Sequence, residues 1–91
     1  MQATATATNQ EGPVIDVRMT RKERELLTLL RQNTGQILSR DYLLQRVWGY
    51  SAGVRTRTLD VHIQRLRRKL RESGFTGEIQ TILRAGYCWQ G

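Results

Sequence analysis

Cysteine, histidine and proline are scarce in this sequence, which contains one of each: Cys88, His62 and Pro13. A single cysteine cannot form an internal disulfide, so the chain suits a reducing compartment. Cys88 lies in a strand-like segment and is interpreted as a packed side chain rather than a reactive thiol. His62 has no second ligand at metal spacing, so we expect no metal site.

The features that mark enzymes and membrane proteins are also missing from the sequence. It contains no Ser/His/Asp set, no Gly-rich phosphate loop and no isolated acidic pair, so we expect neither enzymatic activity nor a cofactor. It has no apolar run long enough to span a bilayer and no signal peptide. These absences predict a protein that acts in the cytoplasm.

Acidic residues are few compared with basic ones. The chain has 15 Lys and Arg against 8 Asp and Glu, a net charge of +7 and a pI near 10.8. This excess favours a polyanionic partner, either nucleic acid or an acidic membrane surface. The most basic segment, from 56 to 71, has no Trp or Phe for a membrane interface, which favours nucleic acid.

The length of 91 residues predicts one domain. Residues 1–12 are alternating Ala and Thr followed by polar residues, and they predict a disordered tail or a linker remnant. The domain, residues 13–91, begins with a strand-like run from 14 to 19. Thr20 and Glu23 have the spacing of a capping box, which predicts a helix over about 21–33.

Two further helices and a hairpin are predicted downstream. Ser39 is the expected N-cap of a second helix that ends at Gly49, and a third helix is predicted over about 56–72. Residues 78–83 and 87–89 are β-prone and are separated by a turn at Ala85-Gly86. Three helices followed by a C-terminal β-hairpin predict an α+β winged helix-turn-helix with a reduced N-terminal strand region.

The third predicted helix has two unlike faces. At 100° per residue an apolar stripe forms on one side, and a polar, mainly basic face forms opposite it. The stripe consists of Leu59, Ile63, Leu66 and Leu70, and the opposite face of Arg57, Val61, Gln64, Arg65 and Arg68. The alternative is a solvated charged face, but such faces usually mix the two signs of charge, and here seven Lys or Arg accompany one acid between 55 and 71.

The side chains of this outer face suit the major groove of DNA. Arginine can bond guanine O6 and N7 together, and glutamine can bond adenine N6 and N7, so Arg65, Arg68 and Gln64 are predicted base contacts. Val61 fits a thymine methyl group. Asp60 either accepts a bond from a cytosine amino group or orients a neighbouring arginine. Arg67 and Arg71 lie nearer the edge of the face, where phosphates are expected.

The sequence contains, in this order, the runs MT-x-x-E-x-x-LL, SRDYLLQRVWGY, RTRTLDVHIQRLRRKL and IQTI-x-x-AGY. These runs resemble the OmpR/PhoB family of bacterial response-regulator output domains, and the resemblance extends over about residues 14–90. The resemblance implies a transcription regulator that binds double-stranded DNA through the third helix in the major groove and the hairpin in the adjacent minor groove. It also implies a protein of the bacterial cytoplasm and nucleoid.

The resemblance implies roles for particular positions. Asp60, Val61 and Arg65 match base contacts. Contacts with the sugar-phosphate backbone are implied for Trp48, Arg57, His62, Arg67, Thr81 and Tyr87. Contact with RNA polymerase, as in some members, is implied for the loop formed by Tyr50, Ser51, Ala52, Gly53, Val54 and Arg55. Trp48 and Tyr87 can equally be core residues, and His62 can instead pack between helices.

The chain departs from the family pattern in three respects. Leu83-Arg84 stands where members usually have Arg-Gly. We therefore expect Arg84 to reach the minor groove if the turn of the hairpin, which is the wing of the fold, is shifted. Only about one strand of the usual N-terminal sheet is present. No receiver domain precedes the output domain, which fits both an excised domain and a stand-alone regulator.

These departures leave two functions open. The first is sequence-specific DNA binding by a domain that is a monomer in isolation and pairs head-to-tail on direct repeats. The alternative is a winged-helix module for protein–protein interaction, with weak or no specific DNA binding, whose basic face meets an acidic partner.

Overall fold

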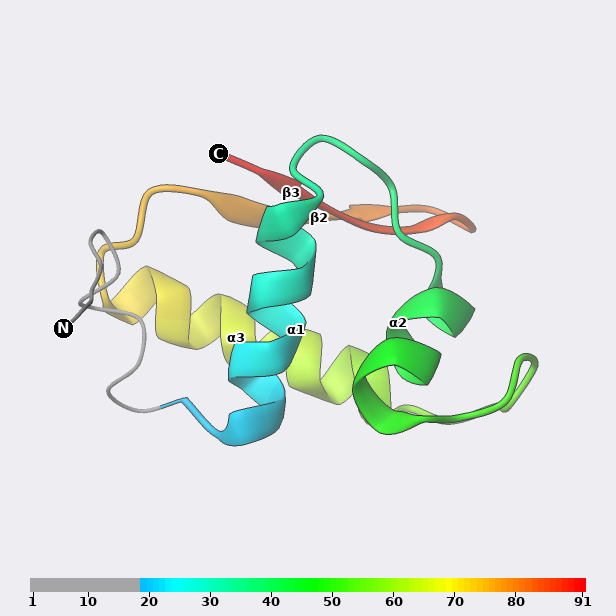
Figure 1. Ribbon diagram of the computed structural model, residues 1–91. Coiled ribbons are helices and arrows are strands. Elements are labelled where there is room, and N and C mark those ends of the chain that lie inside the picture. The colour runs from blue at the N-terminus through cyan, green and yellow to red at the C-terminus, as the bar shows by residue number, and fades with distance from the viewer. Residues whose placement is uncertain (1–18) are drawn as a thin grey trace, which may run out of the picture.

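Three helices and a β-hairpin make up the part of the protein that the computed structural model describes, residues 19–91 (Figure 1). The helices are α1 (Arg21–Gln32), α2 (Arg40–Trp48) and α3 (Thr58–Glu72), and the hairpin pairs β2 (Glu78–Ile82) with β3 (Gly86–Gln90) in antiparallel register. This arrangement confirms the predicted winged helix-turn-helix. The predicted tail over 1–12 and most of the strand over 14–19 lie outside the described residues.

The first two helices begin where the capping residues predict. The Thr20 hydroxyl accepts a bond from the Glu23 amide (3.2 Å) and the Thr20 amide donates to the Glu23 carboxylate (2.9 Å), which is a complete capping box. Ser39 caps α2 by accepting from the Tyr42 amide at 3.1 Å. Gly49 ends α2 in the left-handed conformation, with φ of 79°.

The start of α3 differs from the prediction. The helix begins at Thr58, two residues later than expected, because the Thr56 hydroxyl accepts a bond from the Thr58 amide and keeps the preceding residues out of the helix. Arg57 is therefore the N-cap residue, with φ of −94° and ψ of 3°. Arg57 precedes the first helical residue, which differs from the prediction, and its side chain is exposed, as predicted.

The core is built where the helices meet one face of the hairpin. The four residues of the predicted α3 stripe are 0–4% exposed, which confirms that face of the helix as buried. They join Leu26, Leu27 and Leu30 of α1 and Ile79 and Trp89 of the hairpin. Cys88 is also buried, as its interpretation as a packed side chain predicts.

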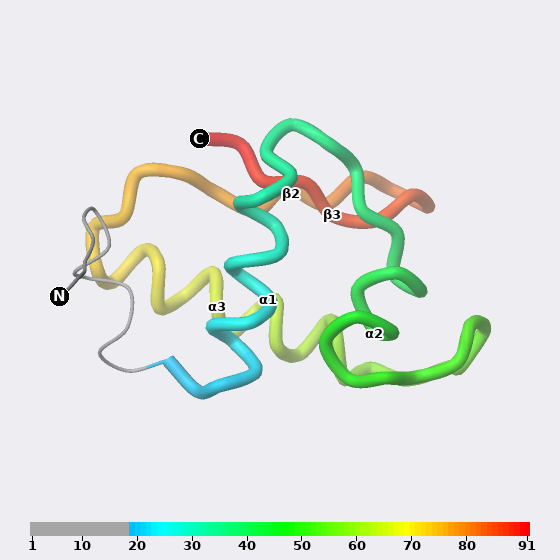
Figure 2. The backbone as a smooth tube through the Cα atoms, in the orientation of Figure 1, coloured from blue at the N-terminus to red at the C-terminus, as the bar shows by residue number. Residues whose placement is uncertain are grey.

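The connection between α1 and α2 runs along the outer edge of the hairpin (Figure 2). Leu38 and Tyr87 exchange backbone hydrogen bonds of 2.8 and 3.0 Å, and the Gly35 amide donates to the Trp89 carbonyl at 2.9 Å. Gly86 makes this approach possible, because a Cβ atom there would lie 2.0 Å from the Leu38 carbonyl oxygen. One edge of the hairpin is thus covered by this loop, and the other edge faces α3.

A buried ion pair connects α1 to α3. The Glu23 side chain is 1% exposed and its carboxylate accepts a 2.6 Å bond from Lys69. Burial acts to raise the pKa of Glu23, but the bonds from Lys69 and the Thr20 amide, with the Lys69 charge, bring this pKa below its ordinary value. The capping residue of one helix therefore also fixes the position of another.

Glu23→Gln is expected to lower the free energy of unfolding by about 2 kcal/mol at pH 7, because it removes a buried charge partner of Lys69. Glu25→Gln on the same helix is the matched control. The partners of Glu25, Arg21 and Lys22, are exposed, so this change should cost under about 0.5 kcal/mol. Urea denaturation of both variants measures the difference, and equal losses would contradict it.

The effect of Glu23 should also depend on pH. Because the pKa of Glu23 is lowered by folding, its stabilisation is fully present above the ordinary glutamate pKa of about 4.3 and is lost as pH falls through the lower folded value. The difference in unfolding free energy between the wild type and Glu23→Gln should therefore narrow in acid. A difference that stayed constant from neutral pH into acid would contradict this.

Candidate nucleic-acid interface

The outer face of α3 is exposed along its length. Burial of the apolar stripe fixes the rotation of the helix, so the side chains predicted to read bases point away from the core. Those exposed are Val61, Gln64, Arg65 and Arg68, together with Arg71. Arg68 makes only a 3.7 Å surface ion pair with Glu72, an interaction weak enough to yield to another anion. The structure thus presents a continuous surface of donors with one apolar side chain.

Asp60, the other predicted base contact, has partners inside the protein. Its carboxylate forms an ion pair with Arg40 of α2 and accepts a 2.6 Å bond from the Tyr87 hydroxyl of β3. The hydrogen bond from Arg40 lowers the pKa of Asp60, against the effect of burial. Asp60 therefore joins α2, α3 and the hairpin, and the arginine it orients comes from another helix.

Tyr87 has the core position that was one of its two predicted alternatives. It is 7% exposed, and burial together with the bond to Asp60 raises the pKa of its hydroxyl to about 12. At neutral pH this hydroxyl is protonated and donates to Asp60. The Tyr87 hydroxyl therefore lies in the contact between β3 and α3 rather than on the open surface.

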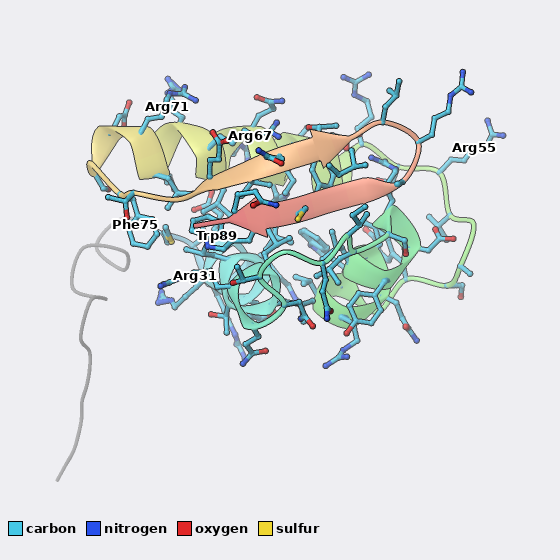
Figure 3. The ribbon with its side chains drawn as sticks, turned by 90° about the horizontal axis from the view of Figure 1, so that it is seen from above. Arg31, Arg55, Arg67, Arg71, Phe75 and Trp89 are labelled. Atoms are coloured by element: carbon cyan, nitrogen blue, oxygen red, sulfur yellow. The ribbon has the colours of Figure 1, made fainter. Side chains whose placement is uncertain are left out.

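Arg67 connects α3 to the hairpin. Its guanidinium donates to the Ile79 carbonyl at 3.0 and 2.7 Å and to the Thr81 hydroxyl at 2.7 Å, and it lies 5.8 Å from the centre of the Tyr87 ring. Figure 3 shows Arg67 between α3 and β2, while Arg71 extends outward from the same helix. Two of the predicted phosphate contacts, Arg67 and Thr81, are therefore bonded to each other.

Trp48 and His62 lie together at the junction of α2 and α3. Their ring centres are 4.8 Å apart in an edge-to-face arrangement, and Nδ1 of His62 is 2.8 Å from the Thr58 carbonyl oxygen. Both side chains are half-buried, and Trp48 packs against the core. The structure thus shows the helix-packing alternative for His62 and leaves part of each ring accessible.

The wing turn is formed by Leu83, Arg84 and Ala85, not by Ala85-Gly86 as predicted; Gly86 already belongs to β3. The Ala85 amide donates to the Ile82 carbonyl at 2.9 Å, and Arg84 has φ of 64°. Arg84 is thus in the left-handed conformation that glycine adopts more easily, and it is exposed at the tip.

The loop between α2 and α3 is exposed from Ser51 to Arg55, whereas Tyr50 packs against the core. Asp41, in the first turn of α2, accepts a 3.2 Å bond from the Gly53 amide and holds the middle of the loop. Figures 1 and 3 show this loop and the wing turn at the same end of the domain.

Sequence reasoning missed the structural roles of two residues, Arg40 and Lys69. Arg40 stands in the predicted second helix and Lys69 in the basic segment of the third, and neither position indicates a partner. Their partners, Asp60 and Glu23, are 20 and 46 residues away in the sequence. A carboxylate predicted to be buried among apolar residues, as Glu23 is on the face of Leu26, Leu27 and Leu30, would have been the signal for a distant cation.

The described residues contain neither a membrane-spanning helix nor a cluster of metal ligands. No helix within residues 19–91 has the length and apolar character needed to cross a membrane. Over the same range, no three His, Cys, Asp or Glu side chains come close enough together to hold a metal ion.

The fold and the exposed face of α3 define a winged helix-turn-helix domain of a kind found in transcription regulators. The chain matches the family model described as "Transcriptional regulatory protein, C terminal" over residues 14–89. It belongs to this family of OmpR/PhoB-type winged-helix output domains.

Curated relatives and solved structures agree with this assignment. The heme response regulator HssR of Staphylococcus haemolyticus is 43% identical over 72 residues, 79% of this chain and 32% of HssR. The DNA-binding domain of Klebsiella pneumoniae RstA, solved in complex with the RstA box, has a TM-score of 0.71 and 32% identity, covering 81% of this chain and 74% of that one. The DNA-binding domain of Escherichia coli CpxR gives 0.71 and 33%, covering 82% and 74%. The chain spans about a third of the length of its curated relatives.

Asp60→Asn is expected to lower the pKa of Tyr87 from about 12 towards the ordinary tyrosine value of about 10, because the negative charge that favours the protonated hydroxyl is removed. NMR titration of protein with ¹³C-labelled tyrosine rings measures it. Asp41→Asn is the control, since Asp41 bonds the Gly53 amide instead. An unchanged Tyr87 in Asp60→Asn would show that burial alone sets its pKa.

Proposed function

We propose that this domain regulates transcription by binding double-stranded DNA at specific sequences. The observation that carries the proposal is the outer face of α3, where Val61, Gln64, Arg65 and Arg68 are all exposed on a helix whose other face is buried. Arginine and glutamine donors suit guanine and adenine edges, and valine suits a thymine methyl group. The fixed rotation of the helix supports a reading role, because base contacts require side chains held in register.

The wing supports a second contact with the same duplex. Arg67 bonds α3 to β2 through the Ile79 carbonyl, so the hairpin is connected directly to the helix proposed to read bases. With α3 in the major groove, we place the exposed Arg84 at the adjacent minor groove. Arg71 and the accessible parts of Trp48 and His62 supply phosphate contacts, which set affinity rather than sequence preference.

The remaining partners are also proposals, and family membership supports them. The domain pairs head-to-tail on direct repeats and is a monomer away from DNA. The exposed loop from Ser51 to Arg55 meets RNA polymerase, and a receiver domain belongs to the same regulator, consistent with the two-thirds of HssR that this chain does not match. The regulator acts in the bacterial cytoplasm, on the nucleoid.

Selection from a randomised duplex pool tests the function directly. Enrichment of a direct repeat with a spacing of about one helical turn would support sequence-specific binding and supply the operator. Affinity for the selected duplex, titrated against salt, should fall with a log–log slope of roughly −4 to −5 if about five phosphates are contacted. No enrichment, with weak binding driven only by salt, would instead favour an acidic protein partner.

Arg65→Ala is expected to cost about 1–3 kcal/mol of binding free energy on the selected duplex and to relax the preference at one base pair. The reason is that alanine lacks the two parallel N–H donors with which the Arg65 guanidinium would bond a guanine. Repeating the selection with the variant measures both effects. If Arg65→Ala weakened every duplex alike, Arg65 would not read a base.

Arg71→Ala provides the contrasting case on the same helix. Arg71 lies at the edge of the outer face, so its loss should weaken all duplexes about equally and make the salt slope shallower by about one. Salt titrations on the selected and a scrambled duplex measure this. A change confined to the selected duplex would move Arg71 to the base-reading group.

A further inference from the structure

The tip of the wing carries an apolar side chain that the fold does not use. Leu83 is 82% exposed, the most exposed of the large hydrophobic residues between 19 and 91. Turn positions normally hold Gly, Asn, Asp, Ser or Pro, which are compatible with water and with turn geometry. Leu83 therefore exposes apolar surface to water and makes no contribution to the core.

The tip is held in a defined place relative to the reading helix. The turn is closed by the bond from Ala85 to Ile82, and β2 is bonded to Arg67 of α3. Arg84, the next residue, is exposed beside Leu83 and has φ of 64°. An apolar residue and an arginine are thus neighbours at the tip of a hairpin that is bonded to α3.

We propose that Leu83 is an apolar wedge that enters the minor groove beside Arg84 and unstacks one base step. Minor-groove proteins combine arginine, which is attracted to the negative potential of the groove, with leucine or similar side chains that insert between bases. This inference rests on the proposed DNA binding and adds a specificity determinant to it. The step under the wing should be a deformable pyrimidine–purine step, TA or CA/TG, because such steps unstack at least cost.

The other exposed apolar residues do not have this combination. Val61 lies on the face of α3 assigned to the major groove. Ile37, 53% exposed, lies in the loop that covers the β3 edge of the hairpin, away from α3. Val54, 41% exposed, belongs to the loop between α2 and α3. Among these four exposed apolar residues, only Leu83 lies at the tip of the wing.

The test uses the duplex selected from the random pool, with 2-aminopurine replacing an adenine at the step under the wing. The fluorescence of this base rises when it is unstacked. Leu83→Ser should bind about tenfold more weakly, a loss in keeping with one apolar side chain returned to water, and should abolish the fluorescence increase. Leu83→Met should retain both, because it keeps an apolar side chain of similar size.

Ile37→Ser is the matched control, since it removes an exposed apolar side chain from the other edge of the hairpin and should leave binding and fluorescence unchanged. Because Leu83 is exposed, Leu83→Ser should also unfold at the same urea concentration as the wild type, which separates a lost contact from a damaged fold.

Three results would overturn the wedge. If Leu83→Ser matched the wild type in affinity and fluorescence while Arg65→Ala still lost specificity, the wedge would be wrong and the proposed function would stand. If Leu83→Ser weakened binding only on duplexes with two half-sites, Leu83 would contact a second copy of the domain instead. If the wild type selected no sequence at all, the wedge and the proposed function would fail together.

Discussion

Burial of the apolar stripe of α3 is the constraint on which the rest of the structure depends. Four side chains, Leu59, Ile63, Leu66 and Leu70, are almost fully removed from water, each worth about 2 kcal/mol. Turning the helix by one residue would expose part of this stripe and bury arginines. The cost of both changes fixes the rotation of α3, and this fixed rotation places Arg65 and its neighbours on the outside.

Polar contacts then set how the other elements sit around α3. Arg67 fastens the wing, Asp60 joins α2 to β3 through Arg40 and Tyr87, and Lys69 reaches Glu23 of α1. The α3 residue in each contact is a sequence neighbour of a residue in the buried stripe. The other elements are therefore connected through α3, and residues at the edges of its outer face bond to partners on those elements.

The departure of the wing from the family pattern has a structural explanation. The pair Leu83-Arg84 lacks the usual glycine, yet the turn forms because Arg84 itself takes the left-handed conformation, at a cost of about 1–2 kcal/mol. The nearby Gly86 is indispensable for another reason, since it lets the Leu38 carbonyl approach the hairpin. Arg84 and Leu83 are therefore both exposed at the tip of the wing.

The sequence by itself determined the elements and their order, because helix caps, apolar periodicity and turn residues act over a few neighbouring positions. The capping box at Thr20, the N-cap at Ser39, the buried stripe of α3 and the hairpin were all predicted, and so was the exposed basic face. The errors were local as well: the bond that the Thr58 amide donates to the Thr56 hydroxyl delays the start of α3, and the turn at Leu83–Ala85 closes before Gly86.

Only the tertiary structure decided which polar residues remain available on the surface. Asp60 was predicted to contact a base or to orient an arginine, and Arg67 to contact a phosphate. Spacing alone leaves such choices open, because it shows the face of a helix on which a side chain lies but not which groups the side chain contacts. Their partners, Arg40, Tyr87 and Ile79, come from other elements, and packing brings them within hydrogen-bonding distance. Periodicity is a property of one segment, whereas the hydrogen-bond and ion-pair partners of a charged side chain depend on how all the elements pack.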